Sequence, residues 1–228
     1  MKTYKEILKS ILNAFRQNLT PALCLLSVSF LIITGYYLIP SFNAMLEKLA
    51  KIKEQYGYGF AFFSTAVAGG FFPYLINVIL KKTNESKLVF LMAFWGVKGV
   101  EIDFFYRIQA FWFGDNTRFL TIFTKTAVDQ LIYTLFWAIP TMILFFTWTH
   151  NLNNPVNMKI LLQKAFKPQN YFAFYFSNCM VWCPTVIIIY QLPLALQLPV
   201  QNIILCFWSL MVLFFTKAEK KQISEAAV

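Results

Sequence analysis

Long stretches without any charged residue are the feature that most constrains how this chain folds. They cover residues 17–46, 55–80, 130–158 and 168–216. A helix that crosses the hydrocarbon core of a bilayer needs about 20 predominantly apolar residues, and each stretch exceeds that length. The last stretch is long enough for two crossings. We place the turn between them at residues 192–199, because two prolines there remove backbone donors and break helices.

A further apolar segment, residues 88–114, predicts a sixth crossing although it contains charged residues. Backbone polar groups in lipid must be satisfied within their own segment, and the alternation expected of barrel strands is missing from the sequence, so each crossing is predicted to be a helix. With 58% apolar and 13% charged residues, the chain has too little polar surface for a soluble globule. The predicted fold class is all-α: a polytopic transmembrane bundle of about six spans with amphipathic interfacial helices.

The predicted organisation has one bundle domain, residues 19–216, between an amphipathic helix at residues 1–18 and a polar tail at residues 217–228. Two segments, residues 3–15 and 41–52, repeat apolar residues at helical spacing with basic residues on the polar side. This pattern is typical of helices that lie in the membrane interface. An uncleaved targeting signal of the mitochondrial type is the alternative for the first segment.

The basic residues predict how the bundle is oriented. With six crossings, most lysines and arginines fall on the side of both termini, which places the termini in the cytoplasm or the mitochondrial matrix. The net charge of +10 fits this asymmetry and contact with anionic lipids of the bilayer. Nucleic acid is not an expected partner, because no basic patch lies on a soluble face.

The sequence offers few residues for catalysis or for metal binding. His150 is the single histidine, so zinc sites and histidine-based triads lack partners. The four cysteines fall inside predicted spans, where burial as small apolar side chains is expected. Cys179 and Cys183 are four residues apart, which leaves a soft-metal site as an alternative. We therefore predict no enzymatic activity, no cofactor and no metal.

The segment 96–107 is unusual because it places four ionisable residues in an apolar helix. At helical spacing Lys98 lies near Glu101, and Asp103 lies near Arg107, which predicts two neutral pairs on nearly opposite sides of the helix. A charge near the bilayer centre costs several kcal/mol unless it faces protein or water. The helix is therefore predicted to lie centrally in the bundle or beside an aqueous cavity.

Asp129 and Gln130 add polar groups at the start of the next predicted span. Lys125, Lys98 or Arg107 could neutralise Asp129. Two alternatives remain open: Asp129 caps or snorkels at the membrane boundary, or it forms a polar constriction with the helix that carries Lys98. In either case the charges also act as structural neutralisers that fix helix register.

Small residues in two predicted spans favour close helix packing. Ala66 and Gly70 have the small-xxx-small spacing that lets backbones approach, and Pro73 predicts a kink one turn later. Gly96 and Gly99 predict a similar contact on the next span.

Several of these positions resemble the small peroxisomal and mitochondrial membrane proteins of the Mpv-seventeen type. Lys125, Asp129 and Gln130 look like the "K…DQ" signature of that family. Gly99 and Tyr106 fall at the spacing of its glycine-proline, histidine, tryptophan-tyrosine motif.

The C-terminal part is similar as well, since Pro193, Asn202 and Trp208 match the spacing of the family's last-helix pattern, and the resemblance covers roughly residues 57–215. The chain departs from the family at several motif positions. These are Val100 for proline, Asp103 for histidine, Gln197 for arginine, Met211 for tyrosine, and Gly69 with Gly70 for a glycine-aspartate pair.

The resemblance implies a pore-like or metabolite-permeability protein of an organelle membrane, without enzymatic activity. The mitochondrial inner membrane is the expected location, with a peroxisomal or bacterial inner membrane as alternatives. The expected polar lining consists of Lys98, Glu101, Asp103, Arg107, Asp129 and Gln130. The alternative function is a non-catalytic accessory subunit or assembly factor, which would bind other membrane subunits or further copies of itself.

Overall fold

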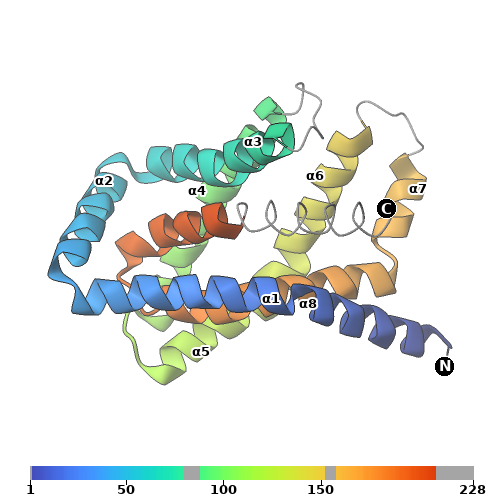
Figure 1. Cartoon of the computed structure of the whole chain (residues 1–228), viewed down its shortest axis with the longest axis horizontal. Helices are drawn as coiled ribbons and strands as arrows, with labels where there is room; N and C mark the ends of the chain where they lie inside the picture. Colours follow the sequence, from blue (N-terminus) through green and yellow to red (C-terminus); the bar gives the residue numbers. More distant parts are fainter. Residues whose placement is uncertain (1, 80–87, 152–157, 209–228) are drawn as a thin grey trace, which may run out of the picture. The chain divides into compact units, whose positions relative to one another are not determined.

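The computed structural model describes residues 2–79, 88–151 and 158–208, and all secondary structure in these ranges is helical (Figure 1). The predicted all-α class is therefore confirmed. The helical elements are α1 (Lys2–Leu38), α2 (Pro40–Thr65), η1 (Ala66–Phe71), α3 (Phe72–Ile79), α4 (Leu88–Phe113), α5 (Phe119–Val128), η3 (Asp129–Ala138), α6 (Ile139–Asn151), α7 (Met158–Ala165) and α8 (Pro168–Ile189). A last apolar helix, Leu194–Trp208, carries no label in Figure 1.

The described residues contain 4 helical segments long and apolar enough to cross a membrane, so the predicted count of six is wrong. These segments are Asn18–Leu38, Pro40–Ile79, Phe119–Thr149 and Pro168–Ile189. The predicted span at residues 88–114 does form a helix, α4, but this helix is not among the four segments because it carries four ionisable residues. The predicted last span is described only as the short helix Leu194–Trp208, because residues 209–216 lie outside the described residues.

These spans support an integral membrane protein in contact with the lipid bilayer. The predicted sidedness of the termini was based on six crossings and stays a prediction. Residue 1, the side chains of residues 2–7, the side chain of His150 and the tail 217–228 are also outside the described part of the chain.

The chain divides into two compact units. Unit 1 contains Met1–Ser27 and Phe113–Gln191, and unit 2 contains Val28–Trp112 and Leu192–Val228. The segment that we expected to form a separate interfacial helix at residues 1–18 is the first part of α1, which continues without a break to Leu38.

In unit 2, α2 bends at Gly57. This residue has φ 53° and ψ −125°, a conformation that favours glycine because it has no Cβ. The bend separates the predicted interfacial segment 41–52 from the apolar arm that continues into η1 and α3. Lys53 follows this segment directly, and its side chain is only 1% exposed.

Small residues let η1 and α2 approach α4 closely in unit 2. A Cβ on Gly70 would lie 2.7 Å from Met92 Cα, and one on Gly96 would lie 2.6 Å from a ring carbon of Phe62. A Cβ on Gly99 would overlap the Ala61 carbonyl oxygen and the Thr65 side chain. The packing role predicted for Gly70, Gly96 and Gly99 is therefore confirmed.

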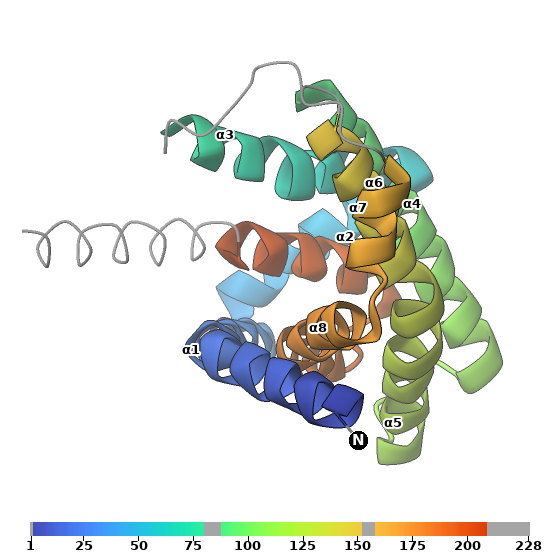
Figure 2. The same cartoon turned by 90° about the vertical axis from the view of Figure 1, so that its right-hand side faces the viewer.

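In unit 1, α5, η3 and α6 form one continuous helix whose middle part is π-helical (Figure 2). Two carbonyl groups of η3 accept hydrogen bonds from α8: the Tyr175 hydroxyl donates to the Gln130 carbonyl at 3.1 Å, and the Tyr171 hydroxyl donates to the Leu135 carbonyl. A π-helical segment disturbs the regular i to i−4 ladder, and side-chain donors from a neighbouring helix compensate for this. These contacts position α8 against the segment that begins with Asp129.

Candidate functional site

The first polar cluster, in unit 2, is centred on Asp103 of α4. Lys53 Nζ lies 2.7 Å from Asp103 Oδ1, and the side chains of both residues are 1% exposed. Arg107, one turn further along α4, donates from Nε to Asp103 Oδ2 at 2.9 Å. Its guanidinium lies 5.6 Å from the centroid of the Tyr58 ring, just beyond the bend of α2. We call Lys53, Asp103 and Arg107 the Asp103 cluster.

The geometry of the Asp103 cluster indicates a structural role. Lys53 and Asp103 form an ion pair. Among the described residues no donor reaches Asp103 Oδ1 with hydrogen-bond geometry, so the contact is mainly electrostatic. A buried ion pair is costly to desolvate but strongly destabilising to break, so it fixes the relative positions of the two helices that supply it. Sequence reasoning missed Lys53 as a partner of Asp103, because the two residues lie on different helices.

The second pair on α4 joins Lys98 and Glu101. Their Nζ and Oε1 atoms are 2.7 Å apart, with the side chain of Lys98 6% and that of Glu101 24% exposed. Lys98 Nζ also lies 5.9 Å from the centroid of the Phe94 ring. Both ion pairs expected from helical spacing on α4 are thus present. The side chain of Glu101 is more exposed than that of Asp103.

The third polar cluster, in unit 1, surrounds Asp129, whose residue exposure is 6%. The Tyr190 hydroxyl donates to Oδ2 at 2.6 Å, Gln130 Nε2 donates to Oδ1 at 3.0 Å, and Thr134 Oγ1 donates to Oδ1 at 3.4 Å. We call Asp129, Gln130, Thr134 and Tyr190 the Asp129 cluster. All four side chains are buried.

The cation predicted as the partner of Asp129 is not found among the described residues of unit 1. Lys125 is 1% exposed, but its Nζ lies 3.8 Å from Asp115 Oδ1 and 5.6 Å from the Tyr190 ring centroid. Lys98 and Arg107 belong to unit 2, where they pair with Glu101 and Asp103. Neutral donors form hydrogen bonds to Asp129 instead. The shortest comes from the hydroxyl group of Tyr190, the residue that directly follows α8.

The residues that carry the family resemblance have different environments. Tyr106 of α4 donates to Gln201 Oε1, and Asn202 lies between Ser64 and Thr65, with distances of 2.9 Å to Ser64 Oγ and 3.0 Å from Thr65 Oγ1. Gly99 faces the same Thr65. These positions therefore meet where α2, α4 and helix Leu194–Trp208 pack together in unit 2.

The other family positions are not part of that contact. Pro193 is exposed in the turn after α8, and its carbonyl accepts from the Leu196 backbone amide at 2.8 Å. Trp208 is the last described residue and is partly exposed. Gln197, which stands at an arginine position of the family, is buried and donates from Nε2 to the Leu192 carbonyl at 3.1 Å.

The described residues contain no group of three or more histidine, cysteine, aspartate or glutamate side chains that could hold a metal ion. None of the four cysteines forms a disulfide. The expectation that they are buried is wrong, because Cys24 is exposed and Cys179, Cys183 and Cys206 are partly exposed. Their helices turn these positions toward the surface of the protein.

We expect Tyr190→Phe to destabilise unit 1 by about 1.5 kcal/mol, because a buried carboxylate loses one of its donors. Unfolding of the purified protein in detergent would measure this change. The control is the same Tyr190→Phe substitution in a protein that already carries Asp129→Asn. There the loss of unfolding free energy should be clearly smaller. Equal losses in both backgrounds would show that the Tyr190 hydroxyl does not act through Asp129.

Comparison with protein families, with curated proteins and with solved structures finds no match to this chain.

Proposed function

We propose that this chain is a non-catalytic subunit or assembly factor of a membrane protein complex, in which the buried charges hold the helices in place. One observation carries this proposal: the carboxylates of Asp103 and Asp129 are 1% and 6% exposed and are enclosed by partners from their own unit. A group that lines a solute path needs contact with water, and these two carboxylates have very little.

A second feature that supports a complex is the apolar surface of the segment Phe119–Thr149. Only 11% of its most apolar stretch is buried inside the protein, compared with 33% for each of the other three candidate spans. Phe119, Phe123, Phe136 and Trp137 are between 54% and 82% exposed along this segment. Phenylalanine and tryptophan side chains are enriched in the interfaces between proteins and their partners.

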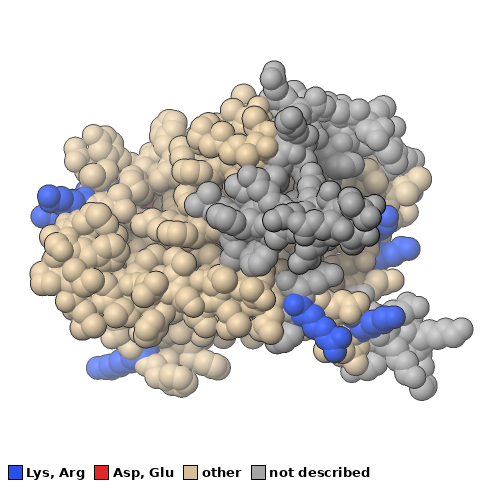
Figure 3. All heavy atoms as spheres, in the orientation of Figure 1, with Lys and Arg blue, Asp and Glu red and all other residues tan. Residues whose placement is uncertain are grey.

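The described surface is also poor in charge. On the face drawn in Figure 3, uncharged atoms cover most of the described surface, and basic side chains are isolated. Lipid or protein can cover such a surface. A partner subunit that packs against Phe119–Thr149 would bury the most exposed of the candidate spans.

A permeability function is the second candidate, and the exposure of Glu101 and Arg107 favours it. Their side chains are 24% and 42% exposed, so two ionisable groups on α4 have access to the surroundings of unit 2. In this alternative Glu101 and Arg107 line a solute path, while Asp103 and Lys98 support them. The resemblance to the Mpv-seventeen family points in the same direction.

We also propose that the chain is a divergent member of that family in the mitochondrial inner membrane. Support comes from Gly99, Tyr106 and Asn202, three family positions that pack together in unit 2. The departures at Asp103 and Gln197 fit a member that has lost solute passage, since both side chains are buried.

The experiment that separates the two functions combines native electrophoresis with flux measurement. For the first function, we expect the protein from its own membranes to migrate far above its 26.6 kDa, together with other chains in fixed proportion. The purified protein in liposomes should then pass no small solute, because its buried carboxylates have very little contact with water.

The variant Glu101→Gln and the control Glu54→Gln, a substitution at an exposed position of α2, complete the design. Monomeric migration together with a solute flux that changes in Glu101→Gln but not in Glu54→Gln would replace the first function by the second. Monomeric migration without flux would contradict both.

A further inference from the structure

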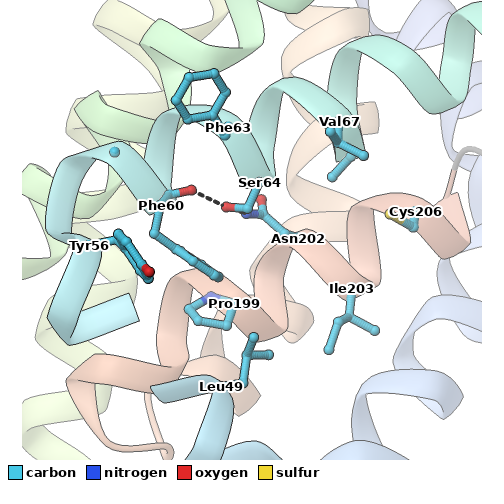
Figure 4. Close-up of a pocket in the computed structure, with 12 residues that line it drawn as sticks. Leu49, Tyr56, Phe60, Phe63, Ser64, Val67, Pro199, Asn202, Ile203 and Cys206 are labelled. Atoms are coloured by element: carbon cyan, nitrogen blue, oxygen red, sulfur yellow. Dashed lines mark hydrogen bonds between the residues drawn. The ribbon is translucent and has the colours of Figure 1, made fainter. Parts of the chain in front are cut away.

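Unit 2 contains an apolar cavity of about 640 Å³ between α2–η1 and helix Leu194–Trp208 (Figure 4). Residues from both helices line it. They are Leu49, Tyr56, Gly59, Phe60, Phe63, Ser64, Val67 and Ala68 on one side, and Pro199, Asn202, Ile203 and Cys206 on the other. We call this cavity the α2 pocket. Its volume is typical of small-molecule sites, which measure about 300–1,000 Å³.

Ser64 and Asn202, the two polar side chains that face each other across the α2 pocket, already have hydrogen-bond partners. Ser64 Oγ donates to the Phe60 carbonyl at 2.6 Å, and Asn202 Nδ2 donates to Ser64 Oγ at 2.9 Å. Asn202 Oδ1 accepts from Thr65 Oγ1 at 3.0 Å. A polar ligand would have to compete with these hydrogen bonds. The pocket therefore selects the hydrocarbon part of a ligand.

The pocket is elongated along α2. Its lining positions repeat at helical spacing from Gly59 to Ala68, which corresponds to about 14 Å of helix. One leaflet of a bilayer contributes about 15 Å of the hydrocarbon core. Because α2 belongs to the candidate span Pro40–Ile79, an apolar chain in the pocket would follow the helix over roughly the depth of one leaflet.

The wall is accessible from the hydrocarbon region. Phe63 is 70%, Tyr56 is 63% and Val67 is 41% exposed, although all three contribute to the lining. A Cβ on Gly59 would meet no atom within 4 Å, so this part of the wall faces open space. Hydrocarbon chains are the molecules that surround such a surface in a membrane, and filling the space restores the contacts that an empty cavity lacks.

An extended hydrocarbon chain is much narrower than an α-helix, which with its side chains is about 10–12 Å wide. Such a chain therefore fits lengthwise between α2 and helix Leu194–Trp208 more readily than a helix of a second copy of the protein does.

From these observations we infer that the α2 pocket binds one acyl chain of a bilayer phospholipid, with the headgroup outside the pocket. The site is distinct from the charged clusters, and this inference does not depend on the proposed function. Bound lipid joins α2 to helix Leu194–Trp208, so it also stabilises unit 2.

Photo-crosslinking tests the inference directly. The protein is reconstituted in vesicles of phosphatidylcholine that contain a small fraction of the same lipid with a diazirine at the end of one acyl chain. After illumination, mass spectrometry of the digested protein locates the adducts. We expect them to be concentrated on lining residues such as Phe60 and Ile203, above the level on Phe111, which is 86% exposed and lies outside the pocket.

Two substitutions at one position provide the matched test. Gly59→Leu places a side chain in the open space of the pocket, whereas Gly59→Ala adds one methyl group there. Gly59→Leu should reduce the pocket adducts at least about ten-fold, since that factor corresponds to about 1.4 kcal/mol, less than two buried methylene groups. Gly59→Ala should keep most of them.

Ile203→Trp fills the pocket from the opposite wall and should have the same effect as Gly59→Leu. Adducts spread evenly over exposed apolar residues in the natural protein would overturn the inference, whether or not the variants fold. An unchanged pocket signal in a folded Gly59→Leu protein would overturn it as well. Crosslinks between two protein chains through the pocket would show a second copy as the occupant instead of lipid.

Discussion

Asp103→Leu is expected to destabilise the protein by about 3–5 kcal/mol, because it leaves a buried charge without its counter-charge. Lys53 is 1% exposed, and its Nζ lies 2.7 Å from Asp103 Oδ1. Leucine is larger than aspartate and, being apolar, offers nothing to the ammonium group. Reversible unfolding in mixed micelles, followed by circular dichroism, would measure the loss.

The double variant Lys53→Met with Asp103→Leu tests the cause of that loss. Replacing both partners of a buried ion pair with apolar side chains is often neutral or stabilising. The double variant should therefore recover most of the stability, although Arg107 then loses its partner at a site where its side chain is 42% exposed.

Glu101→Gln is the matched control on the same helix, since the Glu101 side chain is 24% exposed and its ion pair with Lys98 is the more accessible one. It should cost about 1 kcal/mol or less. If Asp103→Leu cost no more than Glu101→Gln, the Asp103 cluster would not hold α2 and α4 together.

Local sequence spacing predicted some contacts of the charged residues and missed others. Lys98 with Glu101 and Asp103 with Arg107 lie within one turn of α4, so helical geometry alone brings each pair together. Lys53 comes from a different helix, α2, which bends at Gly57 shortly after it. Hydrophobic periodicity contains no information about such a bend.

The Asp129 cluster shows the same limit in a second place. The sequence identified Asp129 and Gln130 as polar groups at the start of a predicted span, but it did not identify Tyr190 as the donor. That contact requires α8 to pack against a π-helical segment, and the transition from α5 to η3 has no signal in the sequence pattern. The length of apolar segments also predicted the spans incompletely. It led us to expect α4 as a span, although its ionisable residues keep it out of the four candidate spans.

Small residues, in contrast, were recognised from spacing alone, because close helix approach depends mainly on the absence of side-chain volume. Their contact between α2–η1 and α4 also bears on the Asp103 cluster and on the α2 pocket of unit 2. Gly99 lies on α4 four residues before Asp103, and it faces Thr65, which donates to Asn202 beside the α2 pocket. A disturbance at this crossing should therefore reach the ion pair and the pocket together.

Gly70→Ala and Gly99→Ala are each expected to destabilise unit 2 by about 3 kcal/mol, near the upper end for overpacking by a small group. The new methyl group at Gly70 would lie 2.7 Å from Met92 Cα and 2.9 Å from Met92 N. At Gly99 it would overlap the Ala61 carbonyl oxygen. These neighbours are backbone atoms, which cannot rotate away, so α2–η1 and α4 must separate.

Gly59→Ala is the matched control, because it makes the same chemical change on α2 where a Cβ meets no atom within 4 Å. It should be neutral or stabilise the protein by about 0.5–1 kcal/mol through helix propensity. The unfolding free energies of the three variants in the same detergent decide the question. If Gly70→Ala and Gly99→Ala matched Gly59→Ala, the close helix crossing would be wrong, and the positions assigned to Asp103 and Asn202 through that crossing would be wrong with it.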